Sequence, residues 1–106
     1  MEVKSEIISQ LIGIRPSILA FALLMEEKLK QNDSKGGWNK CDFSYLVERL
    51  KEETKEMEQA IDEVTMFNKY RSHPRIMKVK YEAADLANFA MMIADNIEKI
   101  DKPLKN

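Results

Sequence analysis

The sequence predicts an all-α fold. We expect an antiparallel helical hairpin plus an N-terminal helix, with a four-helix-bundle-like core completed by oligomerisation. Apolar residues recur at intervals of three and four along the chain, and no segment shows the sustained alternation of a strand. Three glycines and three prolines in 106 residues leave room for long uninterrupted helices. The length favours one domain, which we assign to residues 1–106.

The first third of the chain is expected to hold two helical segments and a loop. A short apolar stretch extends from Ser5 to Ile14, and Pro16 then suits the first turn of a helix that ends near Gln31. Residues 32–42 are expected to form a loop, because they are polar and contain two adjacent glycines.

Two long helices follow in the pattern. Asp42 or Ser44 suits the cap of a helix that continues to about Asn68. A basic turn over residues 69–75 precedes a last helix that begins near Pro74 and ends near residue 100. Three long helices give one chain a thin core, so we expect a homodimer or a homotetramer.

Charge and composition exclude several classes of function. With 17 basic and 18 acidic side chains, a net charge of −1 gives no general attraction to nucleic acid or to a membrane. Cys41 and His73 are the single residues of their types, which excludes an internal disulfide and a cysteine or histidine zinc cluster. Without a run of 18 apolar residues or a signal-peptide pattern, we expect a cytoplasmic protein.

Two pairs of acidic residues interrupt the apolar stripes of the long helices. Glu53 occupies a stripe position between Leu50 and Met57, and Glu56 lies beside it on the next turn. Glu82 likewise stands in the stripe of the last helix, with Asp85 three residues later. The members of each pair are about 4.5 Å apart along the helix axis, on one face.

Four carboxylates in an apolar seam need compensation, because an unpaired buried charge costs free energy or shifts its pKa until it is neutral. No basic residue is expected within the two stripes. Mg²⁺, or Mn²⁺ in its place, would satisfy them, since Mg²⁺ takes carboxylate and water oxygens. The alternative is ordinary helix salt bridges, such as Lys78 with Glu82. That alternative explains one pair better than it explains two.

Residues 52–57 (EETKEM) and 82–89 (EAADLANF) resemble the paired Glu-x-x-Glu and Glu-x-x-Asp signature of the MazG-like all-α nucleotide pyrophosphohydrolases. Segments 25–29 (MEEKL), 35–38 (KGGW) and 43–46 (FSYL) are similar to the small, phage-type members. The resemblance covers residues 21–96, and the ordered set of motifs is more specific than any one of them.

The resemblance implies that Glu53, Glu56, Glu82 and Asp85 hold one or two Mg²⁺ ions. It also implies hydrolysis of nucleoside triphosphates, with deoxynucleoside triphosphates as the expected class, to the monophosphate and pyrophosphate. A water molecule activated by the metal would attack the α-phosphorus. We assign Glu56, with Glu53 beside it, as the catalytic carboxylates that orient this water.

Further residues are predicted to bind the substrate. Trp38 resembles the family's base-stacking aromatic residue, and the alternative is that it packs under its own loop. Asn88 resembles a polar position near the nucleotide, and the alternative is a hydrogen-bonded interhelical amide. Four basic residues are candidates for phosphate contacts: Lys28, Lys35, Arg75 and Lys78. The alternative for Lys28 and Lys35 is that they are plain surface lysines. For Arg75 and Lys78 it is ordinary charge at the start of a helix, but positive charge there opposes the helix dipole, which favours a ligand.

Three other functions compete with this one. A carboxylate-bridged di-iron bundle is excluded, because it requires Glu-x-x-His and the single histidine is expected in a turn. A non-enzymatic helical protein whose acids form intersubunit salt bridges stays open, and it would show no dependence on Mg²⁺. Phosphoribosyl-ATP pyrophosphohydrolase also stays open, but no feature of the sequence selects that substrate.

Overall fold

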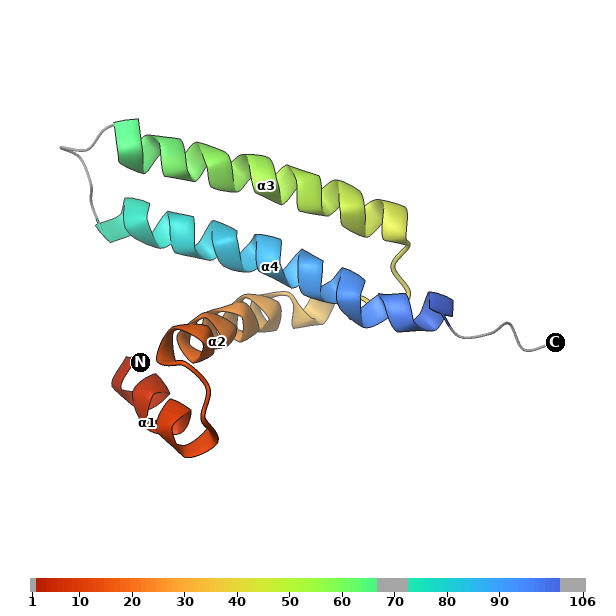
Figure 1. Ribbon diagram of the computed structural model, residues 1–106. Helices are drawn as coiled ribbons and strands as arrows, with labels where there is room; N and C mark the ends of the chain where they lie inside the picture. Colours follow the sequence, from red (N-terminus) through yellow and green to blue (C-terminus); the bar gives the residue numbers. More distant parts are fainter. Residues whose placement is uncertain (1, 67–72, 102–106) are drawn as a thin grey trace.

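The computed structural model describes residues 2–66 and 73–101, and within these ranges the chain is helical with no strand. The predicted all-α class is therefore confirmed. The elements are a short helix, a longer helix, a 3₁₀ turn and two long helices (Figure 1): α1 (Glu2–Ile12), α2 (Pro16–Gln31), η1 (Asp33–Lys35), α3 (Phe43–Met66) and α4 (His73–Asp101).

The breaks between the helices follow from local chemistry. Gly13 has a φ of 74° and its N–H bonds to the Ser9 carbonyl at 2.7 Å, which ends α1 with a left-handed residue that glycine adopts without strain. Pro16 is the first residue of α2, as predicted. The loop that precedes α3 was also predicted, and the turn η1 lies within it.

The hairpin of α3 and α4 is the main body of the molecule. The two helices run antiparallel along their length, α2 packs on α4, and α1 packs on α2 (Figure 1). The predicted end of the third helix near Asn68 and most of the predicted basic turn lie outside the described residues. His73, expected in that turn, is instead the first residue of α4.

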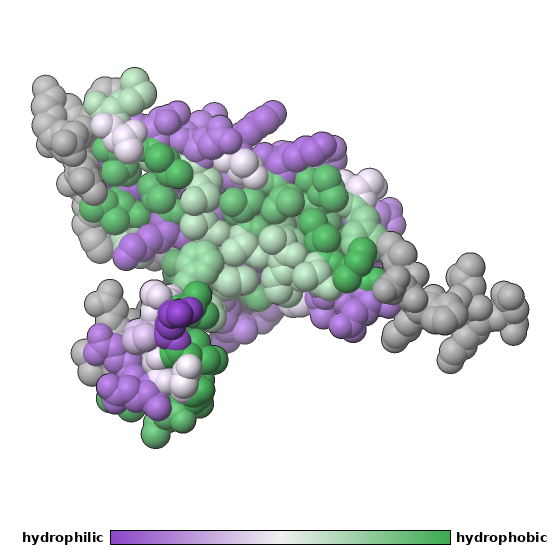
Figure 2. All heavy atoms as spheres, in the orientation of Figure 1, coloured by the Kyte–Doolittle hydropathy of each residue, from purple (hydrophilic) through white to green (hydrophobic). Residues whose placement is uncertain are grey.

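The apolar core is small. Among the residues whose burial the structure describes, the buried apolar ones are Leu46, Ala60 and Ala84. Large apolar side chains remain on the surface of the N-terminal helices, including Leu11 at 79% exposure and Ile18 at 59%. Figure 2 shows apolar residues over the hairpin and at the edge of the α1–α2 pair. The N-terminal helices therefore leave large apolar side chains in contact with water.

None of the described helices is by itself long and apolar enough to cross a membrane. The segments Glu6–Ile12 and Pro16–Gln31 pass the same test of length and composition only when they are taken together, and they are bent by 112° relative to each other.

Candidate metal centre and adjoining cleft

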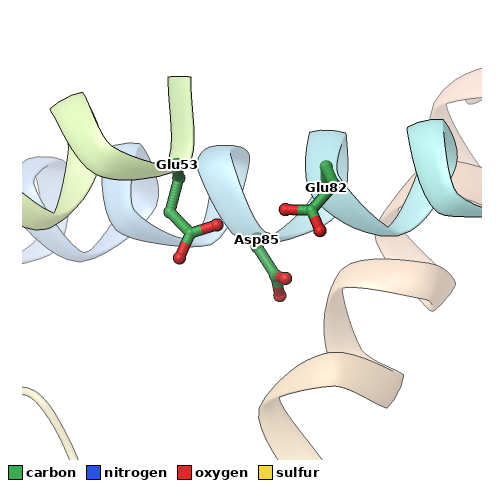
Figure 3. Close-up of side chains that lie close together, drawn as sticks. All are labelled: Glu53, Glu82 and Asp85. Atoms are coloured by element: carbon green, nitrogen blue, oxygen red, sulfur yellow. The ribbon is translucent and has the colours of Figure 1, made fainter. Parts of the chain in front are cut away.

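Three of the four predicted carboxylates converge where α3 faces α4. Glu53 extends from α3, while Glu82 and Asp85 extend from successive turns of α4 (Figure 3). One oxygen of each carboxylate lies within 4.8 Å of the others. The spacing of three residues keeps Glu82 and Asp85 on one face of α4, and the antiparallel pairing of the helices brings Glu53 opposite them.

Two oxygens of this carboxylate triad are buried without a hydrogen-bond donor. Glu53 is 4% exposed, and its Oε1 accepts a hydrogen bond from Nη2 of Arg49 at 2.9 Å. Oε2 of Glu53 and Oε2 of Glu82 are both buried and have no hydrogen-bond partner. Because buried polar atoms are normally paired, these two oxygens point to a missing ligand. Carboxylate oxygens are the donor set that Mg²⁺ prefers, so the residues fit such an ion.

The environment of the triad favours the protonated, neutral carboxyl. Burial, together with the nearby carboxylates of Glu56 and Asp85, raises the pKa of Glu53 to about 7, while Arg49 acts in the opposite direction. Burial and the same two carboxylates also raise the pKa of Glu82. Burial raises the pKa of Asp85 despite the opposing charge of Lys28. Without a cation, the three groups therefore resist carrying full negative charge together.

Glu56, the fourth predicted ligand, adjoins Glu53 and Glu82 but is not one of the three residues whose oxygens converge. Its side chain is exposed, whereas Glu53 is buried. It nevertheless stands close enough to raise the pKa of both Glu53 and Glu82. Glu56 is thus placed at the rim of the triad, which is compatible with contact to solvent water, and its role as ligand or base stays a prediction.

The sequence predicted no basic residue inside the two apolar stripes to pair with these carboxylates directly, and the observed ion pairs show that direct pairing does occur. Arg49 lies one turn before Glu53 on α3, where it pairs with Glu53 and also with Glu52, and its guanidinium lies 5.1 Å from the ring centre of Phe89. Lys28 of α2 approaches Asp85, with 3.6 Å between Nζ and Oδ2. Arg49 was detectable from its spacing of four residues, whereas the approach of Lys28 depends on how α2 packs.

The alternative partner proposed for Glu82 is not the one observed. Lys78 forms its ion pair with Glu63 of α3, at 3.9 Å, and half of its side chain is exposed. The charge of Lys78 acts to lower the pKa of Glu82, but the pKa is raised overall by burial and the neighbouring carboxylates. An ordinary salt bridge within α4 therefore does not compensate the half-buried Glu82 carboxylate.

A cleft of about 380 Å³ opens beside the triad and includes Glu53 and Asp85 in its wall. Three cations line it, namely Lys28, Lys35 and Arg49. The remaining wall is formed by polar and apolar side chains of α2, α3 and α4 and of the residue that follows α2: Leu29, Gln31, Asn32, Tyr45, Asn88, Phe89 and Met92. Acidic and basic groups thus share one cavity, an arrangement suited to a metal-bound anion.

A second hollow of about 300 Å³ continues from the cleft toward the loop before α3. The two share Tyr45, Phe89 and Met92, and the second hollow adds Trp38. Sequence reasoning missed Tyr45, an exposed aromatic residue one turn before Arg49 on the same helix face. The spacing of 45, 49 and 53 was the available signal.

Four of the six predicted substrate-binding residues line these two cavities. Lys28, Lys35 and Asn88 line the cleft, and Trp38 lines the second hollow. Arg75 and Lys78 lie nearer the start of α4 and do not belong to the lining of either cavity. Their proposed phosphate contacts stay predictions without support from this geometry.

Trp38 is tied to α4 by two hydrogen bonds. Its indole Nε1–H donates to Oδ2 of Asp95 at 2.9 Å, and the Asn96 side chain donates to the Trp38 carbonyl at 2.8 Å. These contacts anchor the loop, which is the alternative that the sequence left open for this residue. Base stacking by Trp38 stays a prediction.

No protein-family model matches the chain, and no curated protein or solved structure matches it. The geometry of the triad and its cleft is therefore the basis for a functional proposal.

Proposed function

We propose that this chain is a MazG-like pyrophosphohydrolase that cleaves nucleoside triphosphates, deoxynucleoside triphosphates in particular, to the monophosphate and pyrophosphate with Mg²⁺ bound. The observation that carries the proposal is the triad of Glu53, Glu82 and Asp85, whose ligand oxygens lie within 4.8 Å of one another beside a cation-lined cleft. Two buried carboxylate oxygens of the triad have no hydrogen-bond donor, which supports the presence of a cation at this place.

The cation would be held by the triad, with Glu56 at the rim. When bound, Mg²⁺ would neutralise phosphate oxygens and lower the pKa of a coordinated water. Glu56 is exposed and adjacent to the triad, which supports a role for its carboxylate as the group that would accept the proton of the attacking water. This assignment keeps the base outside the buried cluster, where solvent can carry the proton away.

The cations in the cleft would bind the triphosphate. Lys28 and Arg49 are each paired with a triad carboxylate, so both lie within reach of an anion bound at the same place. Lys35 lines the cleft and the second hollow. Aromatic residues farther along, Tyr45 and Phe89, offer faces on which a base would stack without selecting its identity.

We also propose that the protein works as a homodimer or homotetramer. Both α2 and α3 pack on α4, which supplies three helices of a bundle, and the small core leaves apolar side chains such as Leu11 and Ile18 exposed. A second copy that covers the α1–α2 pair would complete the bundle and remove this surface from water.

The test is a screen for pyrophosphate release from natural and modified triphosphates, including phosphoribosyl-ATP, with and without Mg²⁺. We expect Glu82→Gln to lower Mg²⁺-dependent hydrolysis about 100-fold or more. Glu58→Gln, which removes the same charge from an exposed position of α3, should leave the rate unchanged. If no triphosphate is hydrolysed and Mg²⁺ leaves the melting temperature unaltered, the interaction-protein alternative is favoured instead.

A further inference from the structure

We propose that the side-chain oxygen of Asn88 accepts a hydrogen bond from the 3′-hydroxyl of the substrate sugar, and that this bond makes the enzyme selective for nucleotides that carry this hydroxyl. The inference rests on the proposed function and adds the sugar specificity. It depends on the fixed orientation of one buried amide and on its place between the carboxylate triad and the aromatic residues of the cleft.

The orientation of the Asn88 amide is determined by chemistry. Its Nδ2 donates to the backbone carbonyl of Met25 on α2 at 3.0 Å, and only the nitrogen of the amide can donate to a carbonyl. Oδ1 must therefore occupy the other position. The interhelical hydrogen bond explains the position of the amide nitrogen, and the position of the amide oxygen needs a separate explanation.

The acceptor half has no partner. Asn88 is 3% exposed, and its Oδ1 is buried without a hydrogen bond. Such an atom destabilises a protein when nothing donates to it. Because Asn88 belongs to the wall of the cleft, a ligand in the cleft is placed to supply the missing donor. Phosphate oxygens cannot supply it, since they are acceptors.

The position along α4 indicates which part of a nucleotide lies there. Asn88 is one turn beyond Asp85, about 4.5 Å along the axis, and Met92 lies about one turn farther. With the phosphates at Asp85 and the base near Phe89 and Met92, the sugar lies against Asn88. The 3′ carbon is closer to the phosphate-bearing end of the sugar than the 2′ carbon is, so the 3′-hydroxyl is the expected donor.

The experiment compares kcat/KM for a deoxynucleoside triphosphate, its 2′,3′-dideoxy analogue, and the 3′-deoxy analogue that keeps the 2′-hydroxyl. The wild-type protein should prefer the first over both analogues by about 10-fold, because each analogue leaves Oδ1 unpaired. In Asn88→Ala, the three values should converge to within about 2-fold. A ratio measured within one variant cancels any general loss of folded protein.

The matched control is Asn96→Ala. Asn96 is a second buried amide of α4, 2% exposed, which donates to the Trp38 carbonyl and is not part of the cleft lining. Its removal should retain the 10-fold preference. Equal hydrolysis of the deoxy and dideoxy substrates by the wild type would overturn the inference and leave the hydrolase intact. Retained preference in Asn88→Ala, or a preference for the 3′-deoxy analogue, would also overturn it. Absence of hydrolysis of every triphosphate would overturn both.

Discussion

The metal-free protein is expected to lose stability as the pH rises from about 4.5 to 7, and Glu53→Gln is expected to remove most of that loss. The pKa of Glu53 is raised from 4.5 to about 7, chiefly by burial. The folded state therefore binds the Glu53 proton more tightly than the unfolded state does. Below pH 4.5 both states are protonated. Above pH 7 both are ionised, and the folded state then carries the full cost of the buried charge.

The magnitude follows from the width of that window. One pKa unit corresponds to 1.36 kcal/mol, so a carboxyl whose pKa changes from 4.5 to about 7 lowers the free energy of unfolding by about 3 kcal/mol across it. The raised pKa values of Glu82 and Asp85 act in the same direction. Glutamine at position 53 has no charge to bury, so the free energy of unfolding of the variant should fall much less between pH 5 and pH 8 than that of the wild type, and the remaining fall is the contribution of Glu82 and Asp85.

Urea denaturation at pH 5 and pH 8, with a chelator present, measures this difference directly. Adding Mg²⁺ at pH 8 to about 100 times its Kd should restore about 2.7 kcal/mol to the wild type. It should restore much less to Glu53→Gln, which lacks one ligand. Glu58→Gln serves as the control because this residue is exposed. The reasoning would be refuted if the metal-free wild type became more stable from pH 5 to pH 8. It would also be refuted if metal-free Glu53→Gln were less stable than the metal-free wild type at pH 8.

Three further perturbations test other contacts. Arg49→Gln should weaken Mn²⁺ binding, measured by electron paramagnetic resonance, about 10- to 100-fold because Glu53 loses its hydrogen-bond donor. The control Lys51→Gln removes the same charge from an exposed position and should not weaken Mn²⁺ binding. Tighter Mn²⁺ binding by Arg49→Gln would contradict a positioning role for Arg49. Trp38→Phe should lower the free energy of unfolding by about 1 kcal/mol through loss of the indole hydrogen bond, and unchanged urea denaturation would contradict this. Leu11→Glu should lower the mass observed by light scattering without loss of helicity, since Leu11 is 79% exposed; an unchanged mass would place the interface elsewhere.

The parts of the fold and site that sequence reasoning predicted depend on local spacing. Pro16 opens α2 because its fixed φ and missing N–H suit the first turn of a helix. Glu82 and Asp85 share a face of α4 because they are three residues apart. Glu53 was identified as buried because it interrupts an apolar stripe, and it is 4% exposed. Each of these conclusions needs only one helix.

The contact partners that were not predicted depend on packing between segments distant in sequence. The bond from Asn88 to the Met25 carbonyl joins residues 63 positions apart, and the bond from Trp38 to Asp95 joins residues 57 apart. The approach of Lys28 to Asp85 has the same origin. Neither periodicity nor motif spacing specifies how α2 rests on α4, so these contacts could not be predicted. Arg49 is different, since its position four residues before Glu53 was readable on one helix.

The small core makes the carboxylate triad hard to explain without a ligand. Buried hydrophobic surface is the main favourable contribution to folding, and among the residues with described burial only Leu46, Ala60 and Ala84 are buried apolar ones. Such a chain has little stability with which to offset the cost of ionising the three triad carboxyl groups without a cation. Arg49 and Lys28 each pair with one carboxylate, yet the pKa values of Glu53 and Asp85 remain raised. A divalent cation would stabilise the folded protein, because its attraction to the three carboxylates would offset their mutual repulsion. Metal binding and folding should therefore be coupled in this protein.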